Sequence, residues 1–241
     1  MIDRLKRGVA AGGIAGVAYG AFTWLVVSPL VGGMEHLAAH AGDHGHGHDH
    51  AHAVSEAVTA VVSTGGGVLW GILLGAAFGV AYYLFEPALP GGDRRAYVLA
   101  GAGFLTVSVA PWTVLPPVAP GMEQLYGADV RVALYGGLMV LGALVATASV
   151  AAYGRLRDRG RPVALAAAAV PLAGLGLLAV LAPRTLLLGD APADLVPAFQ
   201  WLVAFGQAGL WALIAASFRR LDRGGRSPAV AADRPSAHPA D

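Results

Sequence analysis

Six long stretches of this chain are almost entirely apolar, and they constrain its fold more than any other feature. A helix needs about 20 mostly apolar residues to cross the hydrocarbon core of a bilayer. None of the six carries an acidic or basic side chain in its middle, and only 13% of the chain is charged, against about 25% in soluble domains. The sequence therefore predicts an all-α polytopic membrane protein with six transmembrane helices, at residues 8–31, 58–85, 97–115, 132–153, 163–182 and 198–218.

Basic residues are divided unequally between the two ends of these stretches. With six spans, 14 of the 16 Lys and Arg residues fall on one side, and only Arg131 and Arg184 fall on the other. Cytoplasmic loops carry the excess of basic residues, so we expect both termini in the cytoplasm. Fifteen arginines beside one lysine are typical of a GC-rich genome, and the predicted location is the bacterial plasma membrane.

The distribution of residue types also divides the chain. Residues 1–220 hold all six stretches and form the predicted membrane domain, whose first outer loop covers residues 34–57. Residues 221–241 are rich in Ala, Pro, Asp and Arg, a composition that cannot form a packed core. They are expected to be a disordered cytoplasmic tail.

Glycines recur every four residues in the first two stretches. Such rows lie along one helix face and let two backbones approach closely. We therefore expect the first two spans to pack as a tight hairpin; the alternative is that the rows only reflect the high frequency of glycine in the chain. Separately, Gln207 in the sixth stretch is expected to hydrogen-bond to a neighbouring helix or to line a path. The glycine rows are Gly12, Gly16 and Gly20 in the first stretch, and Gly67, Gly71, Gly75 and Gly79 in the second.

A short pattern occurs twice at the outer ends of the spans. Residues 28–37 and 116–125 both contain Gly-Met-Glu, a polar residue and Leu, with Pro six residues before the Glu, and residues 188–190 repeat it faintly. Weak sequence repeats are typical of membrane proteins built from repeated units. The pattern suggests three parallel two-helix hairpins, and coincidence in a chain of low complexity is the alternative.

Seven of the eight histidines lie between the first two stretches, on the predicted outer side. Imidazole binds divalent transition metals, and a flexible tract binds several of them with little selectivity. A pH-sensing or merely solvated loop is the alternative. On a helix His36 and His40 would face the same side, and with Glu35 and Glu123 they could form an entry site; otherwise these carboxylates are simply exposed. The predicted capture residues are His44, His46, His48, His50 and His52.

Several functions are disfavoured by what the sequence lacks. The chain has no cysteine, which excludes thiolate metal sites and cysteine catalysis. It has no P-loop, metalloprotease or serine-hydrolase motif. We therefore expect no enzyme activity, no tightly bound cofactor and no nucleic-acid partner. The expected partners are membrane lipid and a divalent metal ion, and any energy source is a gradient or another subunit.

The chain resembles the CbtA-type cobalt transporter subunits over about residues 1–220. The matching elements are a basic start, a glycine-rich first span that ends in Pro29 and Glu35, the histidine-rich loop, and the proline-rich block of residues 111–123 followed by Arg131. The resemblance implies cobalt uptake, commonly linked to cobalamin synthesis, and a small one-span CbtB-type partner with histidines of its own. It also implies about five spans, whereas the charge distribution favours six.

These observations predict divalent cobalt uptake across the plasma membrane, with ion capture by the outer histidine loop. Cobalt itself follows from the resemblance alone. One alternative is a nickel or zinc transporter or an exporter, although an outer histidine loop suits uptake better. Another is a metal sensor or assembly subunit that does not transport, which the scarcity of polar residues inside the spans favours.

Overall fold

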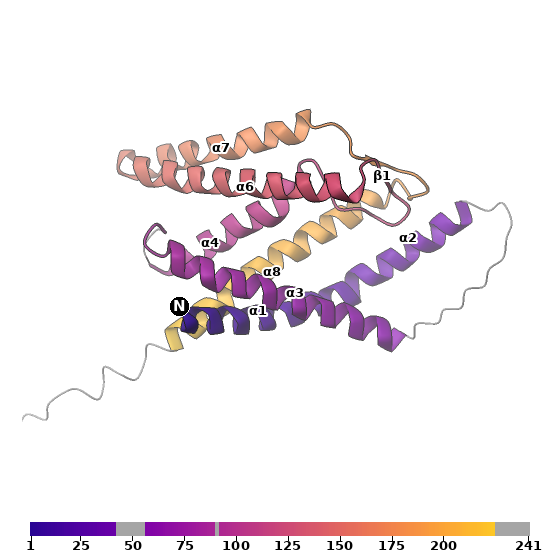
Figure 1. Ribbon diagram of the computed structural model, residues 1–241, viewed down its shortest axis with the longest axis horizontal. Coiled ribbons are helices and arrows are strands. Elements are labelled where there is room, and N and C mark those ends of the chain that lie inside the picture. The colour runs from indigo at the N-terminus through magenta and orange to yellow at the C-terminus, as the bar shows by residue number, and fades with distance from the viewer. Residues whose placement is uncertain (42–55, 90–91, 225–241) are drawn as a thin grey trace, which may run out of the picture.

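The computed structural model describes residues 1–41, 56–89 and 92–224, and these are helical apart from loops and one pair of short strands (Figure 1). The predicted all-α class is therefore confirmed. The elements in order are α1 (Ile2–Phe22), η1 (Thr23–Val27), α2 (Ser28–Ala41), α3 (Glu56–Phe85), η2 (Gly92–Arg94), α4 (Arg95–Phe104), η3 (Leu105–Val109), α5 (Ala110–Trp112), β1 (Glu123–Gln124), α6 (Ala128–Leu156), η4 (Arg157–Arg159), α7 (Arg161–Leu181), β2 (Leu186–Leu187) and α8 (Val196–Gly224).

Five helices are long and apolar enough to cross a membrane, as expected for a multi-pass membrane protein. The third predicted stretch, residues 97–115, is also largely helical, as the continuous run α4, η3 and α5, but it is not among the five. This run rises about 27 Å at 1.5 Å per residue, close to the ~30 Å core of a bilayer. The five helices are Ile2–Leu37, Thr64–Phe85, Ala128–Arg159, Arg161–Leu181 and Val196–Gly224.

The two ends of the described chain meet at one end of the bundle. Arg4, near the start of α1, donates a hydrogen bond to Asp222, near the end of α8. Figure 1 shows the start of α1 beside the end of α8. A described chain that begins and ends at the same end of the bundle runs along it an even number of times, so the run from α4 to α5 is a sixth pass beside the five helices. We call the end where Arg4 meets Asp222 the inner end, and the opposite end the outer end.

The predicted glycine hairpin forms between α1 and α3. A Cβ atom placed on Gly12 would lie 2.1 Å from the carbonyl oxygen of Gly71, and one on Gly75 would lie 2.3 Å from that of Gly8. Both distances are to backbone atoms, which cannot move aside as a side chain would. The glycine rows therefore place the two backbones in direct contact.

Helices α4 and α8 pack against this hairpin and complete the core. Aromatic and aliphatic side chains from α3, α4 and α8 fill the space between the helices, among them Phe78, Trp211 and Phe218. Two more glycines receive large side chains. The rings of Tyr19 and Phe22 cover Gly206, and the ring of Trp211 covers Gly103.

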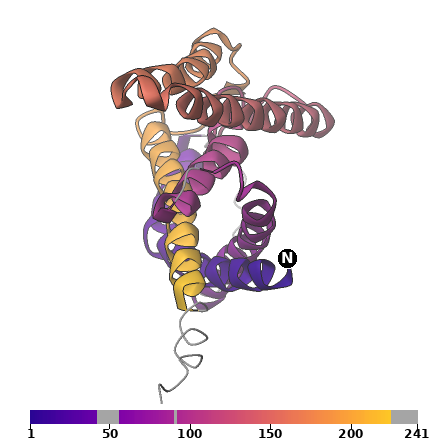
Figure 2. The ribbon, with the colours of Figure 1, turned by 90° about the vertical axis from the view of Figure 1, so that its left-hand side faces the viewer.

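Helices α6 and α7 form a separate antiparallel pair, which Figure 2 shows as a layer beside α1, α3, α4 and α8. Gly160, with φ of 114°, makes the tight connection between them. The pair is attached through α6, where Gly142 packs on Thr106 and Ala110. The expected third hairpin, between the fifth and sixth spans, does not form. The short turn at Gly160 holds α7 on α6, whereas residues 182–195 lead to α8, which packs on α1 and α4.

Two five-residue π-helical segments interrupt the first and third crossings. Each ends two residues before a proline, since η1 precedes Pro29 and η3 precedes Pro111. A proline ring clashes with the carbonyl four residues earlier, and that residue, Leu25 or Val107, is the middle of each π segment. Pro171 lies inside α7 without such a segment, so proline alone does not produce it. The shared offset supports a relation between the first and third spans.

Candidate functional site

The structure places the described part of the predicted metal site at the outer end. Glu35, His36 and His40 lie on α2, and Glu123 lies in β1. The side chains of Glu35, His36 and Glu123 are exposed. The five capture histidines lie outside the described residues, as do residues 225–241 of the expected tail: His44, His46, His48, His50 and His52.

The two Gly-Met-Glu segments meet in one apolar cluster at the outer end. Met34 is 0% exposed and packs with Ala119, Ala191, Val196 and Phe199. The second methionine, Met122, packs against the same cluster. Each methionine thus anchors its segment, and the glutamate that follows it, Glu35 or Glu123, is left at the surface.

The outer loops are held together by backbone contacts, and we call residues 113–127 and 182–195 the outer cap. Strands β1 and β2 pair antiparallel, with Glu123 opposite Leu187. Gly121 and Gly189 both have positive φ, and the carbonyl oxygen of Gly121 accepts a hydrogen bond from the Asp190 amide at 3.1 Å. The faint third copy of the pattern, residues 188–190, therefore lies directly against the second copy.

Within the described residues, no three His, Asp or Glu side chains come close enough together to hold a metal ion. Glu35 and Glu123 are anchored by neighbouring methionines of one cluster, but no third ligand is assembled with them there. Their role in metal entry remains a prediction. Any complete site would need ligands from outside the described residues, such as the histidine tract, or from another chain.

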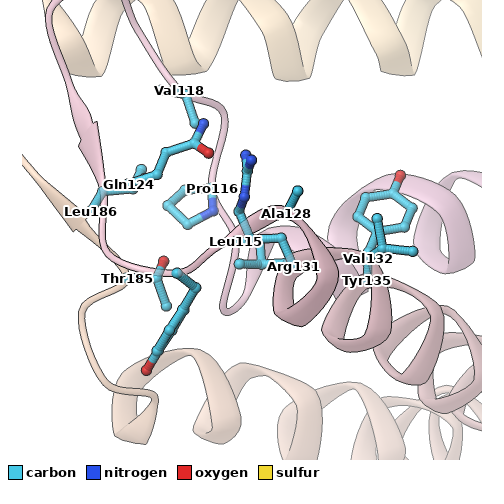
Figure 3. Close-up of a pocket in the computed structure, with 11 residues that line it drawn as sticks. Leu115, Pro116, Val118, Gln124, Ala128, Arg131, Val132, Tyr135, Thr185 and Leu186 are labelled. Carbon is cyan, nitrogen blue, oxygen red and sulfur yellow. The ribbon is translucent and has the colours of Figure 1, made fainter.

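A cavity of about 320 Å³ lies at the outer end beside the cap. Figure 3 shows the head groups of Arg131 and Gln124 pointing into the same space beside Pro116. The Nε of Arg131 is buried and has no hydrogen-bond partner within the described residues. A guanidinium carries a fixed positive charge and no acceptor atom, so this cavity is poorly suited to a metal cation.

The interior between the crossings is apolar, with few polar side chains. The Gln207 amide donates a hydrogen bond to the Tyr19 hydroxyl at 3.2 Å, as its position predicted. The Nε1 atoms of Trp70 and Trp211 are buried without an acceptor in the described part of the chain. Because phenylalanine and leucine fill the rest of this core, the described residues offer a hydrated ion few ligands across the bundle.

Charged side chains join four helix ends at the inner end, an arrangement that the sequence pattern alone did not reveal. Arg4 and Arg7 donate to Asp222, whose side chain is 10% exposed. Glu86 lies 3.3 Å from both Arg4 and Arg95. The sequence feature that could have indicated this network is the presence of three acids, Glu86, Asp93 and Asp222, among the basic residues at these helix ends. This inner ion-pair network consists of Arg4, Arg7, Glu86, Asp93, Arg95, Arg219, Asp222 and Arg223.

Asp93 is the most exposed acid of this network. The hydrogen bond from Arg223 is the main reason why the pKa of Asp93 lies below its usual range. Arg219 adds to this effect from 4.0 Å. The network connects the starts of α1 and α4 with the ends of α3 and α8, and so holds the inner end of the bundle closed.

The chain matches the family model described as "Probable cobalt transporter subunit (CbtA)" over residues 2–221. The chain belongs to the CbtA family. No curated protein and no solved structure matches it. The CbtA match begins with α1 and ends within α8, so it includes every described crossing, the outer cap and most of the inner ion-pair network. A subunit of a cobalt transporter has at least one partner and a metal substrate.

Proposed function

We propose that this CbtA protein takes up divalent cobalt across the bacterial plasma membrane, with its histidine loop outside the cell as the capture element. The match to a cobalt transporter subunit over residues 2–221 is the observation that carries the proposal. Both termini lie in the cytoplasm in this arrangement, which the excess of basic residues at the inner end supports.

The first helix supports capture outside the membrane. The continuous segment Ile2–Leu37 has 36 residues and is about 54 Å long, well beyond the ~30 Å core of a bilayer. Its outer part therefore reaches past the hydrocarbon region and leads directly into the histidine loop. Met34 packs this part on the outer cap, so Glu35 and His36 lie at the same end of the molecule as Glu123. We propose that His44, His46, His48, His50 and His52 deliver ions to these residues.

The apolar core offers a divalent ion few ligands along a path through this chain alone. Leu210, Trp211 and Ile214 are buried between the helices, and bare divalent ions require polar ligands throughout. We infer that the crossing path includes a second chain, in agreement with the family's description as a subunit. A one-span CbtB-type chain with histidines is the partner that the family resemblance implies.

The same apolar core favours one other function. In this second proposal the chain captures metal or assembles a transporter without forming a path itself. Nickel or zinc as cargo, and export in place of uptake, are outcomes that a flux measurement distinguishes.

Metal flux into proteoliposomes tests the proposal, with the purified chain reconstituted alone and with its partner subunit. Replacing Glu35 and Glu123 together by Gln is expected to lower cobalt uptake by about tenfold, since charge-bearing ligands at a pore mouth are functional. Replacing the five capture histidines by Ala should raise the cobalt concentration for half-maximal uptake several-fold and leave the maximal rate nearly unchanged.

The matched control replaces Asp129 and Asp194, two exposed outer carboxylates that are not among the proposed site residues, by Asn. Uptake by this control should equal that of the unmodified chain. Flux absent in every reconstitution would contradict transport and support the capture or assembly role. Unchanged flux in the Glu35 and Glu123 variant would contradict the site, and faster flux of nickel or zinc would contradict cobalt as cargo.

A further inference from the structure

Two adjoining cavities form a groove between α4 and the α6–α7 pair. One has a volume of about 300 Å³ and the other of about 460 Å³, and Val98, Ser149 and Val150 line both. We call them together the inner groove, because the groove begins at the inner end, at Arg94 and Arg157.

The groove exists because α6 packs closely on the third crossing around Gly142 and diverges from it toward the inner end. At Gly142 the two backbones are in contact, and a Cβ atom there would lie 2.9 Å from the Cα of Thr106. Ala146, one turn further, is still buried. Beyond it the helices diverge toward the inner end, as Figure 1 shows for α4 and α6. Gly101, on the α4 side, has open space where a side chain would lie.

The chemistry of the groove changes along its length. At its inner end it is lined by Arg94, Tyr153 and Arg157, and deeper it is lined by apolar side chains such as Phe104, Leu105 and Leu172. From Val98 to Val109 the helix rises about 16 Å, about the depth of one leaflet of a ~30 Å core. The groove is thus basic where lipid head groups lie and apolar where acyl chains lie.

The two arginines are available to an anion. Within the described residues Arg94 forms no ion pair, and Arg157 is paired only with its exposed neighbour Asp158, at 3.7 Å. Such an exposed pair contributes little stability. The Ser149 hydroxyl, between the two cavities, is buried and has no acceptor among the described residues. By contrast, the arginines of the inner ion-pair network are already neutralised by Glu86, Asp93 and Asp222.

We propose that the inner groove binds one anionic phospholipid. Its phosphate group is held by Arg94 and Arg157 at the membrane surface, Tyr153 lies at the level of the head group, and one acyl chain fills the apolar part of the groove. Basic pockets between helices at the cytoplasmic face are suited to anionic head groups. The site is independent of the metal chemistry, so its test does not depend on the proposed uptake of cobalt.

Binding is measured on the full-length chain, delipidated in detergent, by native mass spectrometry and by thermal unfolding. The probes are dioleoyl phosphatidylglycerol, dioleoyl phosphatidylcholine and glycerol 3-phosphate. We expect one phosphatidylglycerol to be retained and to raise the melting temperature by several degrees. Phosphatidylcholine, which lacks a net charge, and glycerol 3-phosphate, which lacks acyl chains, should bind at least tenfold more weakly.

Two variants test the two halves of the groove. Replacing Arg94 and Arg157 by Ala should weaken phosphatidylglycerol binding at least tenfold, and Gly101→Leu should weaken it by filling the apolar part. The controls are Arg159 and Arg161 replaced by Ala, two exposed arginines of the same turn outside the groove, and Gly174→Leu on the exposed face of α7. Both controls should bind as the unmodified chain does.

The proposal is overturned if phosphatidylcholine binds equally well, or if the Arg94 and Arg157 variant loses no more binding than the Arg159 and Arg161 control. In a Gly101→Cys variant, protection from a maleimide by a second copy or by a partner chain, and not by lipid, would also overturn it. All these residues are exposed or border open space, so folding of the variants is checked directly by the same melting curves.

Discussion

At the scale of single residues, the most consequential positions are glycines whose missing side chain admits another backbone. Gly12 and Gly71 are an example, because a methyl group on Gly12 would lie 2.1 Å from a carbonyl oxygen. A methyl group on Gly13, one residue away, would lie 3.9 Å from its nearest neighbour, which is an atom of the flexible Ile72 side chain. Adjacent glycines therefore have different roles.

This difference gives a paired prediction. Gly12→Ala should destabilise the protein by about 1–3 kcal/mol, the usual cost of overpacking, and should lower the melting temperature in detergent by several degrees. Gly13→Ala should leave it unchanged or raise it slightly, since alanine is the better helix former. Equal melting temperatures for the two variants would contradict the close approach of α1 and α3.

Two acids of the inner ion-pair network give a second paired prediction. Asp222→Asn removes the charge shared by Arg4 and Arg7, which are 17% and 27% exposed. It should cost about 3 kcal/mol because the poorly hydrated Arg7 loses its counter-charge and Arg4 keeps only its pair with Glu86. Asp93→Asn removes an exposed carboxylate and should have no measurable effect on melting at physiological salt. A larger effect at Asp93 than at Asp222 would refute this ranking.

The pH dependence of the Asp93 pair follows from its lowered pKa. A carboxyl whose pKa is lower in the folded state stabilises fully above its unfolded pKa and loses that stabilisation as the pH falls through the folded value. The contribution of Asp93 should therefore be constant from pH 5 to 8 and decrease only below about pH 4. Melting curves of the unmodified chain and of Asp93→Asn, recorded across this range at low salt, provide the check.

At the scale of elements, the π-helical segments set the orientation of the helices after them. A π turn holds one residue more than an α turn, so η1 rotates α2 relative to α1 by about 100° compared with a regular helix. This rotation is part of the register that places Met34 in the outer cluster. No periodic signal in the sequence indicates it, since the apolar run of the first span is uniform.

Deletion variants test this role of η1. Deleting Val26 should convert η1 to regular α-helix while the helices on both sides keep their contacts, so folding and melting temperature change little. Deleting Val17, in the regular part of α1, should rotate the two halves of the glycine row by about 100° and prevent folding. Measurement is by size-exclusion chromatography and melting curves, and loss of folding in the Val26 deletion alone would contradict the prediction.

At the scale of the whole molecule, six membrane crossings are predicted, because the described chain begins and ends at the same end of the bundle. The absence of native cysteine makes this directly testable with single cysteines and a membrane-impermeant maleimide in intact cells. Gly45→Cys, in the histidine loop, and Ala193→Cys, in the outer cap, should be labelled at once. Asp158→Cys and Ser227→Cys should be labelled only after permeabilisation. Any other labelling pattern, such as labelling of Ser227→Cys in intact cells, would contradict the topology.

The glycine hairpin, Gln207 and the apolar spans were predictable because each depends on local spacing or composition. Helix periodicity alone aligns Gly67, Gly71, Gly75 and Gly79 on one face. The third hairpin was predicted wrongly because the sequence does not show which neighbour an apolar helix prefers. Helix α7 is apolar on all sides, and the turn at Gly160 and the packing of Gly142 decided that it lies on α6.

The sequence by itself determined the class of molecule, the apolar stretches that cross the membrane and the presence of a histidine tract, since charge and hydropathy act residue by residue. Only the tertiary structure decided that Met34 and Met122 share one cluster and that acids at the inner end pair with arginines from other helices. It also decided that α4 and α6 leave the inner groove between them. These features depend on contacts between residues far apart in the chain, which local patterns do not encode.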